Sequence, residues 1–163
     1  MITEIKMKKI MFVCHGNICR SPMAEFIFKK IAADAGCAHA FLVRSSATST
    51  EEIWRGVGNP IYPPAARELS RHGIPYGRRE ATLLLAEDYG RYDMFIGMDS
   101  NNIRNMYRIF GSDPDGKISK LMSYTGSDAD VSDPWYTERF DRAYDDIYRG
   151  CTALFMKLTQ SAE

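Results

Sequence analysis

The stretch that decides the fold is Cys14-His15-Gly16-Asn17-Ile18-Cys19-Arg20-Ser21-Pro22, which lies between two apolar segments of different periodicity. Residues 10–13 before it form an uninterrupted apolar run, which is typical of a buried strand. Residues 23–35 after it carry apolar side chains at helical spacing, and Pro22 suits the first turn of a helix. The stretch is therefore predicted to be the turn that connects a strand to a helix.

This turn has the composition of a phosphate-binding loop. Backbone N–H groups in such a turn can point inward, and the following helix adds the positive end of its dipole. Arg20 supplies a planar guanidinium that can bind two phosphate oxygens. Cys14, held in this positive environment, is expected to be a thiolate that attacks the phosphorus of a bound phosphoester. The other interpretation of Cys14 is a small buried residue at the end of a strand.

The rest of the chain continues to alternate between strands and helices. The patterns predict strands at residues 9–13, 40–44, 94–98 and 118–121. They predict helices at 22–35, 63–72, 84–89, 101–110 and 140–158, and loops at 45–62 and 123–135. Such alternation indicates an α/β fold: a single domain over residues 1–163, with three layers and a central, mostly parallel four-stranded sheet between helices. Ligands of such sheets bind beyond the carboxyl ends of the strands, where residues 14–22 are expected.

Composition and charge exclude several classes of partner. The 163 residues include 21 Lys and Arg and 21 Asp and Glu, so the net charge is zero and indicates neither a nucleic-acid partner nor a membrane surface. No apolar run approaches the ~20 residues of a membrane span. The basic residues 1–9 lead into an apolar run that is too short for a signal peptide. We therefore expect a cytoplasmic protein.

The four cysteines lack the paired spacing of a zinc site, and a chain of this length does not need disulfides. We expect no metal and no cofactor, and a reducing cytoplasm suits a thiolate nucleophile. Cys37 and Cys151 belong to no motif and are interpreted as structural. Cys19 has two interpretations: a small packing residue, or a thiol within bonding reach of Cys14, because the loop curls around one anion.

Residues 13–22 resemble the signature V-C-x-G-N-x-C-R-S-P of the low-molecular-weight protein tyrosine phosphatases. Far downstream, Asp133-Pro134-Trp135-Tyr136 resembles the acid loop of that family, an Asp-Pro followed by aromatic residues. Segments 45–49, 71–74 and 98–101 match in order and approximate spacing, so the resemblance covers nearly the whole chain. It implies hydrolysis of phosphotyrosine proteins or small aryl phosphates through a phosphocysteine, with inorganic phosphate or similar oxyanions as inhibitors.

The resemblance also implies the roles of the central residues. Cys14 would be the nucleophile, and Asp133 the general acid that later acts as a base. Taken without the resemblance, an Asp-Pro pair is more often only a turn. Arg20 and the loop N–H groups would hold the phosphate oxygens. The phosphate-binding residues are then Cys14, His15, Gly16, Asn17, Ile18, Cys19, Arg20 and Ser21.

A supporting network behind the loop is expected from Asn17, Ser21, Ser45 and His72. Ser21 can cap the helix, donate a hydrogen bond to the Cys14 sulfur, or do both. Asn17 suits a tight loop because asparagine tolerates a left-handed backbone. His72 either holds Asn17 by a hydrogen bond or caps carbonyl groups at a helix end.

The candidate walls of the substrate slot are Trp54, Trp135 and Tyr136. A deep slot with aromatic sides favours a phosphoaryl group and excludes the shorter phosphoserine. The loop that leads to Trp54 is longer than in the shortest family members, which leaves its position open. His15 stands where the family often has an apolar residue, and it is expected at the mouth of the site.

Three other functions use or resemble the same loop and compete with that of a tyrosine phosphatase. An arsenate reductase relays electrons through further cysteines downstream of the loop, and there are none between Cys37 and Cys151. Protein-arginine phosphatases of the same fold carry a threonine where this loop has Ile18, and they lack bulky aromatic residues after Asp-Pro. A phosphate-binding module without enzymatic activity would not need both Cys14 and Asp133.

Overall fold

The computed structural model describes residues 6–160 and is built around one parallel sheet. Its strands lie in the order β2 (Phe41–Ala47), β1 (Lys8–Cys14), β5 (Met94–Gly97) and β6 (Ile118–Lys120), and every neighbouring pair is parallel. This confirms the predicted α/β fold with a four-stranded parallel sheet. The carboxyl ends of the two central strands lie at the same edge, because Val13 pairs with Gly97.

Strand β1 is buried on both faces, which explains its uninterrupted apolar sequence. Ile10 and Phe12 belong to the larger hydrophobic core, whereas Met11 and Val13 belong to the smaller core on the opposite face. None of these four side chains is more than 5% exposed. The alternation follows from the period of two in a strand.

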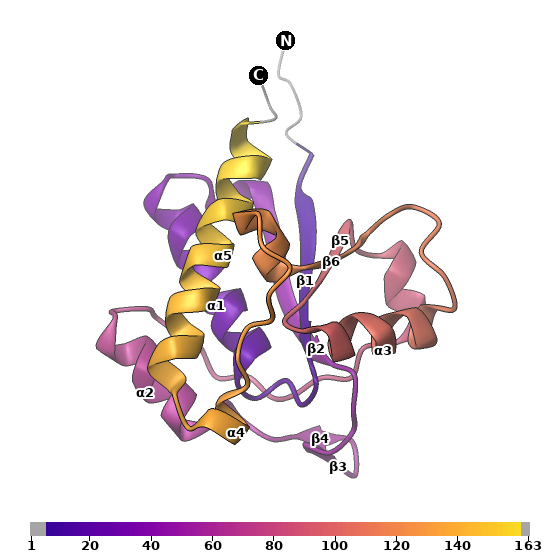
Figure 1. The fold of residues 1–163 in the computed structure, drawn as a ribbon, viewed down its shortest axis with the longest axis horizontal. Coiled ribbons are helices and arrows are strands. Elements are labelled where there is room, and N and C mark those ends of the chain that lie inside the picture. Colours follow the sequence, from indigo (N-terminus) through magenta and orange to yellow (C-terminus); the bar gives the residue numbers. More distant parts are fainter. Residues whose placement is uncertain (1–5, 161–163) are drawn as a thin grey trace.

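Helices cover both faces of the sheet and complete three layers (Figure 1). One face packs against α1 (Arg20–Asp34), α2 (Pro63–Arg71) and α5 (Phe140–Gln160). The other face packs against α3 (Ser100–Phe110) and the short 3₁₀ helix η2 (Ala86–Gly90). One face of α5 is buried, since Tyr144, Ile147, Cys151, Leu154 and Phe155 are all at most 8% exposed.

The two predicted loops contain regular structure. The first begins as strand, because residues 45–47 continue the pairing of β2 with β1. It then forms an antiparallel hairpin of β3 (Ile53–Trp54) and β4 (Val57–Gly58). The second loop contains most of the 3₁₀ helix η3 (Leu121–Thr125) and the start of α4 (Pro134–Thr137). A further 3₁₀ helix, η1 (Ala38–Ala40), precedes β2.

The loop after β1, the β3–β4 hairpin and α4 all lie at one end of the molecule, the lower end in Figure 1. Segments far apart in the sequence therefore meet beyond the carboxyl end of β1. Within residues 6–160, none of the helices combines the length and apolar character needed to cross a bilayer.

Candidate active site

The loop between β1 and α1 curls around the sulfur of Cys14. The backbone N–H groups of Asn17 and Ser21 donate to Sγ at 3.3 and 3.4 Å, and the Ser21 hydroxyl lies 2.9 Å from it. Cys14 is only 4% exposed. Donors converging on a sulfur stabilise its negative charge. Ser21 does not cap α1, because the helix begins at Arg20 and Ser21 lies within its first turn.

Asn17 organises this loop from behind. It adopts a left-handed backbone conformation with φ of 59°, which asparagine tolerates better than most residues. Its side-chain Nδ2 donates to Ser21 Oγ at 2.8 Å. Its Oδ1 accepts from the backbone N–H of Thr82 at 3.0 Å and from the guanidinium of Arg79. Arg79 and Thr82 lie in a segment without periodicity, so no sequence pattern predicts their contact with Asn17.

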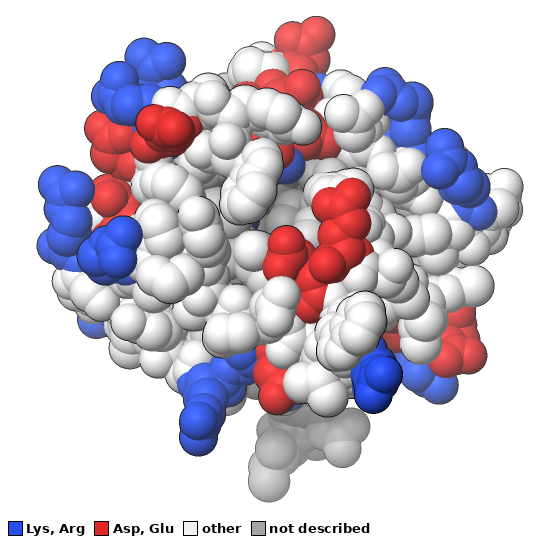
Figure 2. Space-filling model, turned by 90° about the horizontal axis from the view of Figure 1, so that it is seen from below, with Lys and Arg blue, Asp and Glu red and all other residues white. Residues whose placement is uncertain are grey.

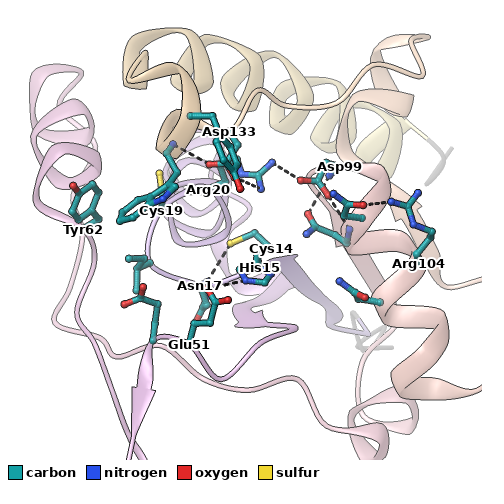
Figure 3. A pocket seen from close by; sticks show the side chains of 18 of the residues that line it. Cys14, His15, Asn17, Cys19, Arg20, Glu51, Tyr62, Asp99, Arg104 and Asp133 are labelled. Atoms are coloured by element: carbon teal, nitrogen blue, oxygen red, sulfur yellow. Dashed lines mark hydrogen bonds and ion pairs between the residues drawn. The ribbon is translucent and has the colours of Figure 1, made fainter.

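Arg20 lies at the base of the site and is 3% exposed (Figure 3). Its Nη1 lies 2.9 Å from Asp99 Oδ2 and donates to the Val131 carbonyl at 3.0 Å, and its Nη2 lies 3.5 Å from Asp133 Oδ2. Burial opposes the charge of the guanidinium, but Cys14 and the two carboxylates outweigh it and raise the pKa of Arg20. Residues 98–101 contributed only to the family resemblance, and nothing in their sequence predicted that Asp99 contacts Arg20.

Asp133 follows a loop that is anchored at Val131 and leads into α4. The Val131 N–H donates to the Met98 carbonyl at 2.9 Å, which ties the loop to the end of β5. Asp133 is then the N-cap of α4, and its Oδ1 accepts from the Trp135 N–H at 3.0 Å. Its side chain is 33% exposed. The Asp133 carboxylate therefore lines the cleft beside the Arg20 guanidinium and remains open to solvent.

These groups line one cleft of about 600 Å³, and aromatic side chains form one of its sides. The ring of Tyr62 lies 5.7 Å from that of Trp135 and 5.9 Å from that of Phe140. Tyr136 also lines the cleft and is 84% exposed. Tyr62 was not predicted from the sequence as a site residue. Its N–H donates to the Ile18 carbonyl at 2.8 Å and so joins this wall to the loop.

The rim of the cleft beside His15 carries acidic side chains. His15 turns its ring outward, with Nε2 3.0 Å from Glu51 Oε2, and Glu52 also lines the cleft. Figure 2 shows acidic side chains gathered around a hollow near the centre of this end, with most basic side chains toward the edge. On the opposite side α3 contributes Arg104 and Arg108. The base of the cleft, in contrast, carries the buried guanidinium of Arg20.

Trp54 does not form a wall of the cleft, contrary to the expectation from its sequence. It lies in the β3–β4 hairpin, is 74% exposed, and is absent from the described residues that line the cleft. Its ring lies 5.5 Å from the guanidinium of the neighbouring Arg55. The hairpin is held by Asn59, whose side chain donates to Glu52 at 2.7 Å. The longer loop therefore presents glutamates to the cleft.

Ser45, expected in the network behind the loop, is hydrogen-bonded to a residue of α1. Its hydroxyl donates to Glu25 Oε1 at 2.7 Å, and the other oxygen of Glu25 lies 2.6 Å from Lys29 Nζ. Among the hydrogen bonds of the described residues, none joins Ser45 to Asn17. The reason is its position in β2 opposite Phe12, where its side chain meets α1.

His72 is also engaged away from Asn17. Its Nε2 lies 3.2 Å from Glu68 Oε1, one turn earlier in the chain, and its ring stacks on Tyr144 of α5 at 3.7 Å. It follows the last residue of α2, so its side chain packs between two helices. In the described part of the chain the partners of the Asn17 oxygens are Arg79 and Thr82.

All four cysteines are free thiols. Cys19 lines the cleft, and burial together with the nearby Cys14 raises the pKa of its thiol. Cys151 is fully buried, with Sγ 3.6 Å from the carbonyl oxygen of Ala24. Cys37 packs beside the larger core. Neither of the last two is among the residues that line the cleft.

Phosphoryl transfer to a thiol needs a nucleophilic sulfur, a cation for the phosphate oxygens and a proton donor for the leaving group. This cleft brings those three groups together, which is the arrangement of the cysteine-dependent phosphatases. Residues 9–163 match the family described as low molecular weight phosphotyrosine protein phosphatase, and the chain belongs to that family.

Relatives of known name agree with this assignment. The low molecular weight protein-tyrosine-phosphatase YfkJ of Bacillus subtilis is 34% identical over 159 residues, which cover 96% of this chain and 99% of YfkJ. The low molecular weight protein-tyrosine-phosphatase PtpA of Staphylococcus aureus is 32% identical over 157 residues, which cover 96% of this chain and 97% of PtpA. The crystal structure of YfkJ superimposes with a TM-score of 0.90 over 97% of this chain and 98% of YfkJ. A structure of Vibrio vulnificus Wzb in complex with benzylphosphonate gives 0.80 at 25% identity, over 93% of this chain and 99% of that one.

Proposed function

We propose that this chain acts as one phosphatase domain that hydrolyses phosphotyrosine in proteins, and small aryl phosphates, through a phosphocysteine. The observation that carries the proposal is the environment of the Cys14 sulfur. Three donors converge on it at 2.9–3.4 Å, and it lies in a cleft with Arg20 and Asp133. Membership of the family supports the same reaction.

In the first step, Arg20 and the loop N–H groups bind the phosphate oxygens of the substrate. Because Asp99 already fixes the Arg20 guanidinium at 2.9 Å, little reorganisation is needed. Cys14 Sγ attacks phosphorus, so that a sulfur–phosphorus bond forms while the bond to the phenolic oxygen breaks. Asp133 donates its proton to that oxygen, and the phenol leaves.

In the second step, the Asp133 carboxylate takes a proton from a water molecule, whose oxygen attacks the phosphorus. The sulfur–phosphorus bond breaks, and inorganic phosphate is released. Cys14 departs as a thiolate, which the Ser21 hydroxyl and the Asn17 N–H stabilise from 2.9 and 3.3 Å. The same donors serve the sulfur as nucleophile and as leaving group.

The aromatic side of the cleft supports an aryl substrate. A phenyl ring can pack against Tyr62, Trp135 and Tyr136 while its phosphate reaches Cys14. A phosphoserine has no ring to bridge this depth. The related Wzb was solved in complex with benzylphosphonate, in which one methylene joins a phosphonate to a phenyl ring. Inorganic phosphate and similar oxyanions would bind to the same loop N–H groups and Arg20, and would inhibit the enzyme.

The thiols distinguish this reaction from arsenate reduction. A reductase relays electrons through further cysteines downstream of the loop, and the two cysteines beyond the loop, Cys37 and Cys151, lie away from the cleft. Cys151 is 0% exposed, and burial raises the pKa of its thiol. A hydrolase needs only Cys14. We place the enzyme in the cytoplasm, because four free thiols suit a reducing compartment.

The test is a comparison of hydrolysis rates on phosphotyrosine, phosphoserine and phosphoarginine peptides of the same sequence, with and without EDTA. We expect the phosphotyrosine peptide to react fastest and EDTA to have no effect. Cys14→Ser should abolish turnover and still bind vanadate, because the N–H groups and Arg20 remain. Faster hydrolysis of phosphoarginine would identify an arginine phosphatase, and appreciable turnover by Cys14→Ser would refute the covalent mechanism.

A further inference from the structure

We propose that Arg79 is a positioning residue of this site: its guanidinium fixes Asn17, and through Asn17 and Ser21 it orients the hydrogen bonds that hold the Cys14 sulfur. The inference rests on the proposed role of Cys14 as nucleophile. Arg79 lies outside regular structure, between α2 and η2, and it is not among the residues that line the cleft. It therefore acts from behind the loop and not on the substrate.

The contact between Arg79 and Asn17 involves two oxygens of one residue. Arg79 Nη1 donates to the Asn17 backbone carbonyl at 2.6 Å, and Nη2 donates to Asn17 Oδ1. A guanidinium presents its donors as a rigid planar fork, so this pairing fixes the backbone and the side chain of Asn17 together. Asn17 has a φ of 59°, a conformation that the surrounding structure must hold.

The orientation of the Asn17 amide then decides where a proton points. Oδ1 is occupied by Arg79 and by the Thr82 N–H at 3.0 Å, so Nδ2 faces Ser21 Oγ at 2.8 Å. Ser21 Oγ accepts this hydrogen bond, and its own hydrogen is left for Cys14 Sγ at 2.9 Å. The chain of donors thus runs from Arg79 through Asn17 and Ser21 to the sulfur.

The charge of Arg79 acts in the same direction. Its side chain is partly buried, and burial lowers its pKa, while Glu25 and Cys14 counteract that shift. The guanidinium is therefore within electrostatic reach of the sulfur. His72, which the resemblance suggested as the partner of Asn17, is bonded to Glu68 and stacked on Tyr144.

The experiment measures alkylation of Cys14 by iodoacetate as a function of pH, read by mass spectrometry of the Cys14 peptide, because the thiolate reacts and the thiol does not. The variants are Arg79→Leu, which removes fork and charge, and Arg79→Lys, which keeps the charge and loses the fork. Arg78→Leu is the matched control, since Arg78 is exposed and adjacent. Circular dichroism establishes that each variant is folded. The kcat and KM for an aryl phosphate are measured alongside.

For Arg79→Leu we expect the pH of half-maximal alkylation of Cys14 to rise by about one unit and kcat to fall about tenfold, the effect of losing one charge-assisted hydrogen bond. KM should change much less, because Arg20 still binds the phosphate. Arg79→Lys should lie between this variant and the wild type, whereas Arg78→Leu should match the wild type.

An unchanged pH profile in folded Arg79→Leu would overturn the proposal. If that variant does not fold, a wild-type profile and kcat in Arg79→Lys would overturn it instead. An equal shift in Arg78→Leu would show a general effect of surface charge and would also refute it. Alkylation does not require turnover, so a failure of the proposed phosphatase activity would be seen separately in the peptide assay.

Discussion

Replacing Asp133 by Asn isolates the proton-transfer role of this residue, because the structure allows the amide to keep its other contacts. Asp133 Oδ1 accepts from the Trp135 N–H at 3.0 Å as the N-cap of α4, and asparagine caps a helix about as well as aspartate. The loop is also held independently at Val131, which bonds to Met98 and Arg20. We therefore expect Asp133→Asn to fold with its loop in place.

The expected loss is about 10²–10⁴-fold in kcat, or roughly 3–5 kcal/mol, the usual contribution of a positioned general acid. The variant also loses the ion pair of Asp133 with Arg20, whose atoms are 3.5 Å apart. With Asp133 33% exposed, that pair contributes about 1 kcal/mol or less, which is about fivefold. A larger loss must come from the missing proton.

The assay is a series of aryl phosphates whose phenols differ in acidity, from an activated nitrophenol to a phenol with a pKa near about 10, like that of tyrosine. A nitrophenolate leaves without a proton, so its phosphate should lose little rate in Asp133→Asn, and the loss should grow with the pKa of the leaving group. An equal loss across the series would refute the assignment of Asp133 as the acid and point to Arg20.

Two further predictions concern oxidation and acid stability. Peroxide should convert Cys14 to a sulfenic acid, with which the Cys19 thiol condenses to a disulfide and water; wild type should then recover with a dithiol, whereas Cys19→Ser should recover poorly. A digest without reduction that shows Cys14 linked elsewhere, or complete recovery without any link, would leave Cys19 a packing residue. Burial opposes the charge of Asp113, but donors from Tyr89 at 2.6 Å and from the N–H of Lys117 at 2.8 Å hold its pKa below 3.8. The contribution of this carboxylate to stability is therefore full above its unfolded-state pKa of about 4 and is lost as the pH falls through the lower folded-state pKa. The urea stability of Asp113→Asn should differ from that of wild type most near neutral pH, and the difference should shrink in acid. A difference that does not change with pH would contradict this.

The part of the site that the sequence predicts is the part that depends on local signals. An apolar run, a turn with cysteine and arginine, and a helix with proline in its first turn together place Cys14 and Arg20 at the carboxyl end of β1. The parallel sheet follows from the same alternation of strands and helices along the chain. Asp133 is far away in sequence, and only the resemblance to a family connected it with this loop.

The partners of Asn17 could not be predicted, because they depend on the path of an irregular segment. Residues 75–82 have no apolar periodicity, so nothing in their sequence places Arg79 behind the loop. His72 is at a helix end, where its sequence position suggests capping or a polar contact. Its ring instead packs between α2 and α5, stacked on Tyr144. Tyr62 was missed for a related reason, since an aromatic residue before a helix is ordinary packing until its neighbours are known.

The two carboxylates around Arg20 are both N-caps of helices, but they differ in how firmly they are held. This difference explains why one positions Arg20 and the other can donate a proton. Both Asp99 and Asp133 are N-caps. Asp99 caps the eleven-residue α3 in a reciprocal capping box with Asn102, is 15% exposed, and holds Arg20 at 2.9 Å. Asp133 caps a four-residue helix, is 33% exposed, and lies 3.5 Å from the same guanidinium. The tighter carboxylate fixes the cation that binds phosphate, and the looser one is free to meet the leaving group, which is what a proton donor on a short, exposed helix requires.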